Sequence, residues 1–202
     1  GAPHIKHASL RALFERLLTQ ALERAASHAS PPRVLDLGAG EGSVTRLLLE
    51  RGAAVTAVDV SEIQLAALRQ RCASFADRLD IRCGEVETVL QSLDGPYDLA
   101  VASAFLHHVP DYLGFVRRVI PLLDPHGQFL SFQDPLRYDT IGAITKAVAE
   151  LGYLSWGIFQ GDLRGGLRRR LRRARGHLSN TPLDNAEYHV LRNGVDQEAI
   201  AR

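Results

Sequence analysis

The chain has 202 residues, of which 46% are hydrophobic and 23% are charged, and its formal net charge is +1 at pH 7. This length suits one domain with a full core and is too short for two comfortable ones. No stretch approaches the roughly 20 apolar residues that cross a bilayer, and no signal-peptide pattern opens the chain, which favours a cytoplasmic protein without a membrane partner.

The spacing of the cysteines and the positions of the arginines further limit the kinds of protein that this chain can be. Cys72 and Cys83 have neither zinc-site spacing nor the pattern of a disulfide framework, which favours a reduced, metal-free protein. Seven arginines lie between Arg164 and Arg175, so the rest of the chain is net acidic. Leucines spaced by four in this run predict a helix with a solvated arginine face. Because no aromatic platform accompanies it, we do not expect a nucleic-acid partner, and its role is otherwise left open.

The predicted elements begin with an N-terminal helix and continue as an alternation of strands and helices. Apolar side chains at helical spacing over residues 9–26 predict a helical cap within residues 1–30, which Pro31 and Pro32 end. The strands that follow are 33–37, 54–58, 79–82, 97–102 and 128–132, and the helices are 44–51, 62–76, 86–92 and 111–123. Connections long enough for crossovers predict a mainly parallel, doubly wound α/β sheet with helices on both faces.

The most informative segment runs from Val34 to Gly42, where a buried strand leads into a glycine-rich turn that opens a helix. Glycines let a ligand approach the backbone closely and permit positive φ angles. Asp59 lies 19 residues after Gly40, just past the next strand, where its carboxylate can accept hydrogen bonds from both hydroxyls of a ribose. The strand, turn, helix and acid together predict a nucleotide-type site.

The same turn discriminates between nucleotide ligands. Position 43 is serine where a dinucleotide fingerprint has its third glycine, and the Gly-Lys-Ser/Thr of a Walker phosphate loop is missing. Asp36 and Glu41 would repel a pyrophosphate, whereas Asp36 suits a ligand with an ammonium group, bound directly or through water. These features favour S-adenosylmethionine (SAM).

Several segments resemble one family, the class I SAM-dependent methyltransferases. Residues 36–42 resemble its motif I, Val58-Asp59-Val60-Ser61 its motif II, and residues 97–111 its motif IV with the loop that follows. Cys83-Gly84-Glu85-Val86 is similar to the segment that meets the adenine, and residues 123–130 resemble the segment leading into the fifth strand. The resemblance covers residues 30–135.

This resemblance implies a Rossmann-like sheet of strand order 3-2-1-4-5, a SAM-binding core over residues 31–134 and a small-molecule acceptor. It also implies SAM as cofactor, with S-adenosylhomocysteine as the product. The cofactor-binding residues that we expect are Asp36, Gly38, Ala39, Gly40, Asp59, Val60, Glu85, Val86 and Ser103.

The C-terminal third departs from the family pattern. The family sheet usually ends in two further strands, whereas the only convincing candidate after Phe132 is residues 187–192, so we expect a truncated or unusual sheet edge within the segment 187–202. Residues 135–186 follow the fifth strand without a clear strand of their own. Because such an insertion emerges beside the cofactor, we expect a helical lid over the acceptor within a single domain of residues 1–202.

Two adjacent histidines are the candidate catalytic bases. His107 and His108 follow the fourth predicted strand, at the edge of the sheet where ligands bind, and imidazole has a suitable pKa range for a base at neutral pH. The alternative is that both only shape the loop. These two histidines and Asp134 could form a metal site, but their spacing matches no metal-ligand pattern, so we expect no metal.

Three functions compete for this sequence. The favoured one is a small-molecule O-, N- or C-methyltransferase, in keeping with specialised metabolism. An RNA or protein methyltransferase is the second, although residues 103–106, Ser-Ala-Phe-Leu, replace the Asn/Asp-Pro-Pro-Phe/Tyr motif of amino-group methylators. The third is a non-catalytic nucleotide-binding module or a nicotinamide oxidoreductase. The sequence leaves the acceptor, the methylated atom and the oligomeric state open.

Overall fold

The computed structural model describes residues 7–135, 142, 144–145, 147–148 and 194–202. The chain falls into two compact units, Gly1–Asp134 and Pro135–Arg202, which are described separately. Among the described residues, no helix has both the length and the apolar character needed to cross a bilayer.

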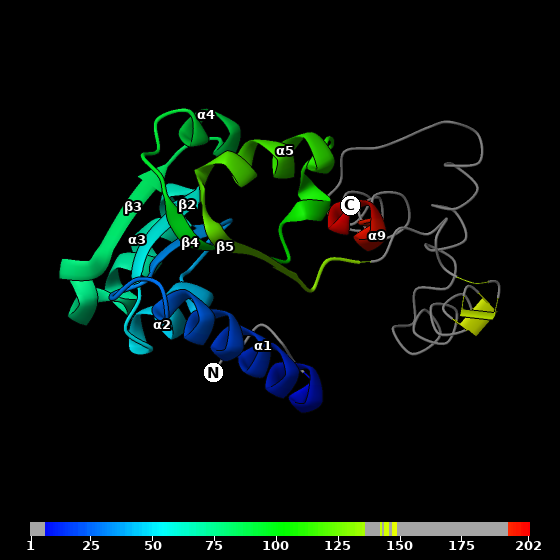
Figure 1. The fold of residues 1–202 in the computed structure, drawn as a ribbon, viewed down its shortest axis with the longest axis horizontal. Coiled ribbons are helices and arrows are strands. Elements are labelled where there is room, and N and C mark those ends of the chain that lie inside the picture. The colour runs from blue at the N-terminus through cyan, green and yellow to red at the C-terminus, as the bar shows by residue number, and fades with distance from the viewer. Residues whose placement is uncertain (1–6, 136–141, 143, 146, 149–193) are drawn as a thin grey trace. The chain divides into compact units, whose positions relative to one another are not determined.

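The first unit is built on one parallel sheet of five strands in the order β3-β2-β1-β4-β5 (Figure 1). The strands are β1 (Arg33–Leu37), β2 (Ala54–Asp59), β3 (Leu79–Cys83), β4 (Tyr97–Ser103) and β5 (Leu123–Phe132). Strand order reverses direction between β1 and β4, which creates a crevice outside the carboxyl ends of these strands where ligands bind in such sheets. The predicted fold class and strand order are confirmed.

Helices cover both faces of this sheet, as the right-handed crossovers of a doubly wound fold require (Figure 1). One face carries α1 (Ala8–Ala26), α2 (Ser43–Glu50) and α3 (Glu62–Arg71), and the other carries α4 (Val86–Leu90) and α5 (Tyr112–Val119). Short 3₁₀ segments follow α3, β4 and α5: Ala73–Arg78, Leu106–His108 and Ile120–Leu122.

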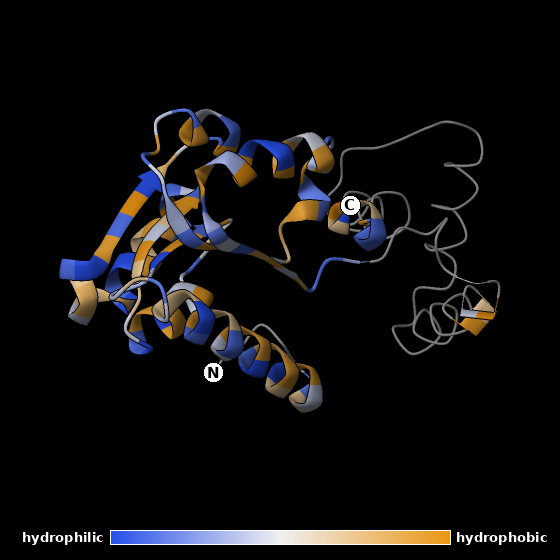
Figure 2. Ribbon diagram, in the orientation of Figure 1, coloured by the Kyte–Doolittle hydropathy of each residue, from blue (hydrophilic) through white to orange (hydrophobic). Residues whose placement is uncertain are grey.

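Helix α1 is amphipathic, and its apolar face is part of the core. Figure 2 shows alternating apolar and polar bands along it. Phe14 and Leu18 are fully buried in the cluster that includes Leu48 and Val101, and the Phe14 ring centroid lies 4.9 Å from that of Phe132 on β5. Burying such side chains contributes about 1.5–3 kcal/mol each, which fixes α1 to the sheet.

Three predicted elements differ from the structure by more than two residues at one end. The helix expected over residues 111–123 ends at Val119 and gives way to a 3₁₀ segment that contains Pro121, which has no N–H to continue the helix. The helix expected over residues 62–76 ends at Arg71 and gives way to the 3₁₀ segment, in which Phe75 has a non-helical φ of −124°. The fifth strand begins at Leu123 instead of residue 128, because Leu123 pairs with Tyr97 on β4 and the intervening turn residues form an irregularity in the ladder.

The second unit is described at its two ends. Its last helix, α9 (Gln197–Ala201), begins at Asp196, whose carboxylate accepts a hydrogen bond from the Ala199 amide at 3.0 Å. Val195 N–H donates to the carbonyl of Pro135 at 2.7 Å. Most of the predicted lid, the run Arg164–Arg175 and the strand candidate 187–192 lie outside the described residues.

Candidate functional site

The glycine-rich turn between β1 and α2 is held by backbone hydrogen bonds to β2. The amides of Gly38 and Ala39 both donate to the Val58 carbonyl, at 2.9 and 3.0 Å. Gly38 has a φ of +72°, and a Cβ there would lie 2.3 Å from the Phe105 ring, so only glycine lets that ring approach. At Gly40, with a φ of +54°, a Cβ would meet no atom of the described residues within 4 Å. Gly40 therefore adjoins a space that this part of the chain leaves open.

Asp59 ties this turn to the beginning of α3. Its Oδ2 accepts the Gly40 amide at 2.8 Å, and its Oδ1 accepts the Ser61 amide at 2.9 Å. The sequence indicated a ribose-binding role for this residue but not its role in shaping the turn. A carboxylate has about four acceptor positions, so the two amides leave capacity for ligand hydroxyls.

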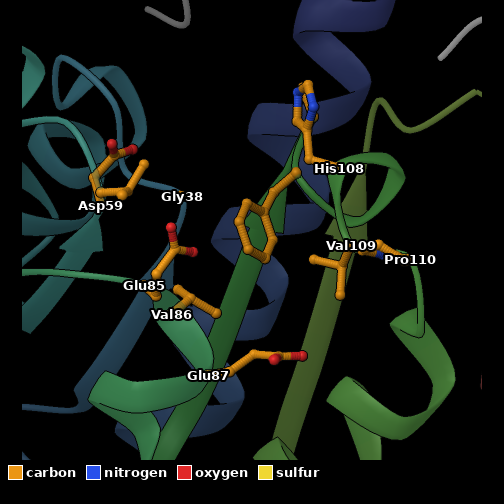
Figure 3. A pocket seen from close by; sticks show the side chains of 11 residues that line it. Gly38, Asp59, Glu85, Val86, Glu87, His108, Val109 and Pro110 are labelled. Atoms are coloured by element: carbon orange, nitrogen blue, oxygen red, sulfur yellow. The ribbon is translucent and has the colours of Figure 1, made fainter. Parts of the chain in front are cut away.

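A cavity of about 560 Å³ opens at the carboxyl ends of β1, β2 and β4, within the usual size range of small-molecule sites. Figure 3 shows Asp59, Glu85 and Val86 across from His108 and Val109. The lining residues are Gly38, Asp59, Val60, Glu85, Val86, Glu87, Ala104, Phe105, His108, Val109 and Pro110.

The cavity is acidic. Asp59, Glu85 and Glu87 contribute carboxylates, and no lysine or arginine is among the described residues that line it. Glu87 is paired with Arg118 of α5 at 2.5 Å, so the negative charge that the cavity presents comes mainly from Asp59 and Glu85. The geometry therefore favours a ligand that carries positive charge.

The structure brings most of the predicted cofactor residues together. Gly38, Asp59, Val60, Glu85 and Val86 line the cavity, and Ala39 and Gly40 belong to the adjoining turn. The sequence did not single out Glu87, Phe105, Val109 or Pro110 for the cofactor site. Two of them, Val109 and Pro110, lie directly after the histidine pair, and this position in the sequence could have identified them as lining residues.

Asp36 does not line the cavity. Its side chain is buried, and its Oδ2 accepts a hydrogen bond from the Thr45 hydroxyl on α2 at 2.6 Å. Burial raises the pKa of Asp36 to about 6, against the opposing effect of the Thr45 hydrogen bond, and the nearby Asp59 charge adds to the rise. Nothing in the local sequence pointed to Thr45 as its partner.

Ser103 closes β4 beside the cavity. Its Oγ is buried and has no hydrogen-bond partner among the described residues. A buried polar atom without a partner is rare in folded proteins, so this hydroxyl fits a site that a ligand completes. Ser103 itself is not one of the cavity's lining residues.

The two histidines occupy different places. His108 is exposed and lines the cavity, whereas the His107 ring places Nδ1 2.7 Å from Oδ1 of Asp134. The two imidazole centroids are 4.0 Å apart. Within the part of the chain that the structure describes, no group of three or more His, Cys, Asp or Glu residues is placed to hold a metal ion.

Comparisons with known proteins define the class. A family model described as methyltransferase domain matches residues 7–190, and the chain belongs to this family. Membership confirms the resemblance to class I SAM-dependent methyltransferases and SAM as the cofactor.

The chain is similar to two bacterial proteins named ubiquinone biosynthesis O-methyltransferase. It is 32% identical to that of Idiomarina loihiensis over 124 residues, which are 61% of this chain and 50% of the relative. It is 34% identical to that of Azotobacter vinelandii over 96 residues, 48% of this chain and 41% of the relative. The chain therefore matches half or less of the length of these relatives.

Among solved structures, the chain resembles WbdD co-crystallised with the kinase inhibitor LY294002. The TM-score is 0.50 at 22% identity, and the likeness covers 55% of this chain and 28% of WbdD. At this identity the likeness supports the shared fold alone.

Proposed function

We propose that this chain transfers a methyl group from SAM to a hydroxyl group of a small-molecule acceptor in the cytoplasm. The observation that carries the proposal is the acidic cavity beside the glycine-rich turn, with Asp59 and Glu85 on its wall. Such a cavity attracts a ligand with a sulfonium and an ammonium and repels a pyrophosphate. The names of the O-methyltransferase relatives support oxygen as the methylated atom. Two free cysteines support a reducing compartment.

The residues present fit SAM by their chemistry. Asp59 can accept hydrogen bonds from the ribose hydroxyls, and Glu85 with the Val86 amide can recognise the adenine edge. The space at Gly40 and the Ser103 hydroxyl, which the described residues leave open and without a hydrogen-bond partner, suit the methionine part. When bound, SAM supplies an electrophilic methyl group on a sulfonium, so the protein needs only to orient the acceptor and remove its proton.

His108 is the base in this proposal. Its imidazole lines the cavity and is exposed, so it can contact an acceptor hydroxyl and accept the proton at a ring nitrogen. Phe105, Val109 and Pro110 surround the same cavity with apolar surface that excludes water from the acceptor.

The test combines calorimetry with product analysis. Titration of the purified chain with SAM measures cofactor affinity, and incubation with SAM and a panel of phenols and catechols, read by mass spectrometry, detects methylated products. His108→Ala should lower turnover about 10²–10⁴-fold while SAM affinity stays near the wild-type value. The matched control is His126→Ala, an exposed histidine near the amino end of β5. Absence of SAM binding by the wild-type chain contradicts the proposal.

A further inference from the structure

A buried carboxylate joins the ends of two neighbouring strands at the edge of the site. Asp134 lies two residues beyond β5, and its side chain is only 3% exposed. Its Oδ1 accepts the His107 backbone amide at 3.1 Å and lies 2.7 Å from His107 Nδ1, and its Oδ2 accepts the Ser131 hydroxyl at 3.0 Å. The cluster Ser131, Asp134 and His107 thus links β5 to the 3₁₀ segment after β4.

This geometry fixes which ring nitrogen of His107 carries a proton. A carboxylate is an acceptor only, and Oδ1 of Asp134 already accepts the backbone amide of the same histidine. The ring must therefore donate from Nδ1 across the 2.7 Å contact. In the neutral imidazole the lone pair is then on Nε2, because the two nitrogens divide these roles.

The backbone on both sides of the cluster is held in a left-handed conformation. Gln133, directly before Asp134, has a φ of +66°, and Ala104, between β4 and His107, has a φ of +53°. This conformation is unfavourable for a residue with a Cβ. The Ala104 amide also donates to the Phe132 carbonyl at 2.8 Å, so the two strand ends are tied together at this point. Strain of this kind persists where surrounding contacts over-determine the conformation, and such places are often functional.

We propose that Asp134 is a positioning residue for the base of the proposed reaction. It holds His107 as the Nδ1–H tautomer through two hydrogen bonds to one residue, and it thereby fixes the 3₁₀ segment that presents His108 to the cavity. The His107 and His108 rings are in contact, with centroids 4.0 Å apart and planes 42° apart, so fixing the first ring limits the rotation of the second. This inference rests on the proposed function only for the role of His108 as the base.

The test is a measurement of imidazole tautomers. Multiple-bond ¹H–¹⁵N spectra of the histidine-labelled chain, at a pH where the rings are neutral, report which nitrogen is protonated, and His107→Ala and His108→Ala assign the signals of the two site histidines. We expect wild-type His107 as the Nδ1–H tautomer. Asp134→Asn should weaken this preference and raise the Nε2–H population, because the asparagine oxygen that keeps the His107 amide accepts Nδ1–H without the negative charge, and should displace the His108 ring signals. A wild-type His107 protonated on Nε2 overturns the proposal.

Three controls separate positioning from folding and from the proposed function. Asp124→Asn removes a carboxylate at the amino end of β5, where it accepts the His126 amide, and should leave both site histidines unchanged. Ser131→Ala removes one hydrogen bond to Asp134 and should displace the His107 signals less than Asp134→Asn does. SAM affinity, measured by calorimetry, should be retained in Asp134→Asn.

The outcomes are distinguishable. If Asp134→Asn leaves the His108 signals in place, or abolishes SAM binding together with the tautomer change, Asp134 is not a positioning residue. If Asp134→Asn does not fold, the wild-type tautomer and the Ser131→Ala shift decide the proposal, which is overturned by unmoved His107 and His108 signals in Ser131→Ala. A wild-type chain that shows the expected tautomer but no SAM binding contradicts the proposed function and leaves this inference standing.

Discussion

Asp59 uses both carboxylate oxygens to hold the amides of Gly40 and Ser61, so its side chain shapes the turn. In the proposed function the same side chain also accepts hydrogen bonds from the ribose of SAM. Asp59→Ala removes both amide contacts and the ribose acceptor. Hydrogen bonds to a charged group contribute about 1.5–3 kcal/mol each, so the loss of one ribose bond should weaken SAM binding about 10- to 100-fold. Isothermal titration with SAM measures this change.

Asp80→Asn is the matched control for this substitution. Asp80 is exposed on the edge strand β3 and pairs with Arg82 at 2.8 Å, a surface ion pair that contributes little to stability. The control should bind SAM like the wild type. Equal SAM affinity in Asp59→Ala and Asp80→Asn would remove Asp59 from the cofactor site.

Asp36 makes the stability of the protein depend on pH. Its pKa in the folded state is about 6, above the ordinary 3.8, because its carboxyl is buried. The folded state therefore binds more protons than the unfolded state between these values, and stability from this group is lost as the pH rises through them. The cost at neutral pH is about 3 kcal/mol.

Asp36→Asn should therefore be more stable than the wild type at about pH 7.5, by up to about 3 kcal/mol, and the gain should vanish at about pH 4. Asparagine keeps an oxygen that can accept the Thr45 hydroxyl. Urea unfolding at both pH values measures the difference. A difference in stability that is equal at both pH values contradicts the role of burial.

The sequence alone could not show which of the two adjacent histidines lines the cavity. His107 and His108 are adjacent and chemically identical, and their difference arises from Asp134, which the fifth strand brings back beside them from 27 residues away. The positions of Asp59 and Glu85 at the carboxyl ends of their strands were predictable because their spacing from the strands is set locally. The hydrogen bond of Asp36 to Thr45 was not, because it depends on how α2 packs against β1.

Among the turns between elements, two glycines allow the cost of the backbone conformation to be measured separately from an effect on ligand binding. Gly40 and Gly52 both have positive φ, +54° and +91°, and a Cβ at either would meet none of the described atoms within 4 Å. Alanine at either position should lower the free energy of unfolding by about 1 kcal/mol, the cost of the left-handed conformation. Only Gly40→Ala should lose SAM affinity, because Gly52 lies between α2 and β2, at the opposite end of the sheet.

Thermal unfolding and calorimetry on the two alanine variants test this pair. Similar stability with a selective loss of SAM binding in Gly40→Ala is the expected result. Equal SAM affinity in the two variants would mean that the space beside Gly40 is not part of the cofactor site.

The ends of some strands and helices could not be predicted from the local sequence pattern. The strands β1, β2 and β4 were predictable from their buried apolar runs. The first residues of β5 were not, because Pro125 and Gly127 are typical of a turn, whereas the pairing of Leu123 with Tyr97 is a long-range contact. Asp124 supports the irregularity by accepting the His126 amide at 2.9 Å. The helix predicted at α3 was too long because apolar residues at helical spacing, Leu68, Cys72 and Phe75, continue beyond its end at Arg71.

At the scale of the whole molecule, charge is unevenly distributed. The net charge of +1 includes seven arginines between Arg164 and Arg175, so the remainder of the chain is acidic, as is the cavity at Asp59 and Glu85. Long-range attraction of a cationic cofactor and repulsion of an anionic one follow from this distribution, and both weaken as salt increases.

Cofactor binding should accordingly stabilise the whole chain selectively. A ligand at 100 times its Kd adds about 2.7 kcal/mol to the folded state, which corresponds to a rise in Tm of roughly 5–10 °C for a chain of this size. SAM should produce this rise, whereas NAD⁺, whose pyrophosphate is repelled by the carboxylates of Asp59 and Glu85 on the cavity wall, should produce none. Differential scanning fluorimetry at low and high salt measures both. A rise with NAD⁺ equal to that with SAM would show that the turn accepts a pyrophosphate, and the electrostatic basis of the cofactor assignment would then be wrong.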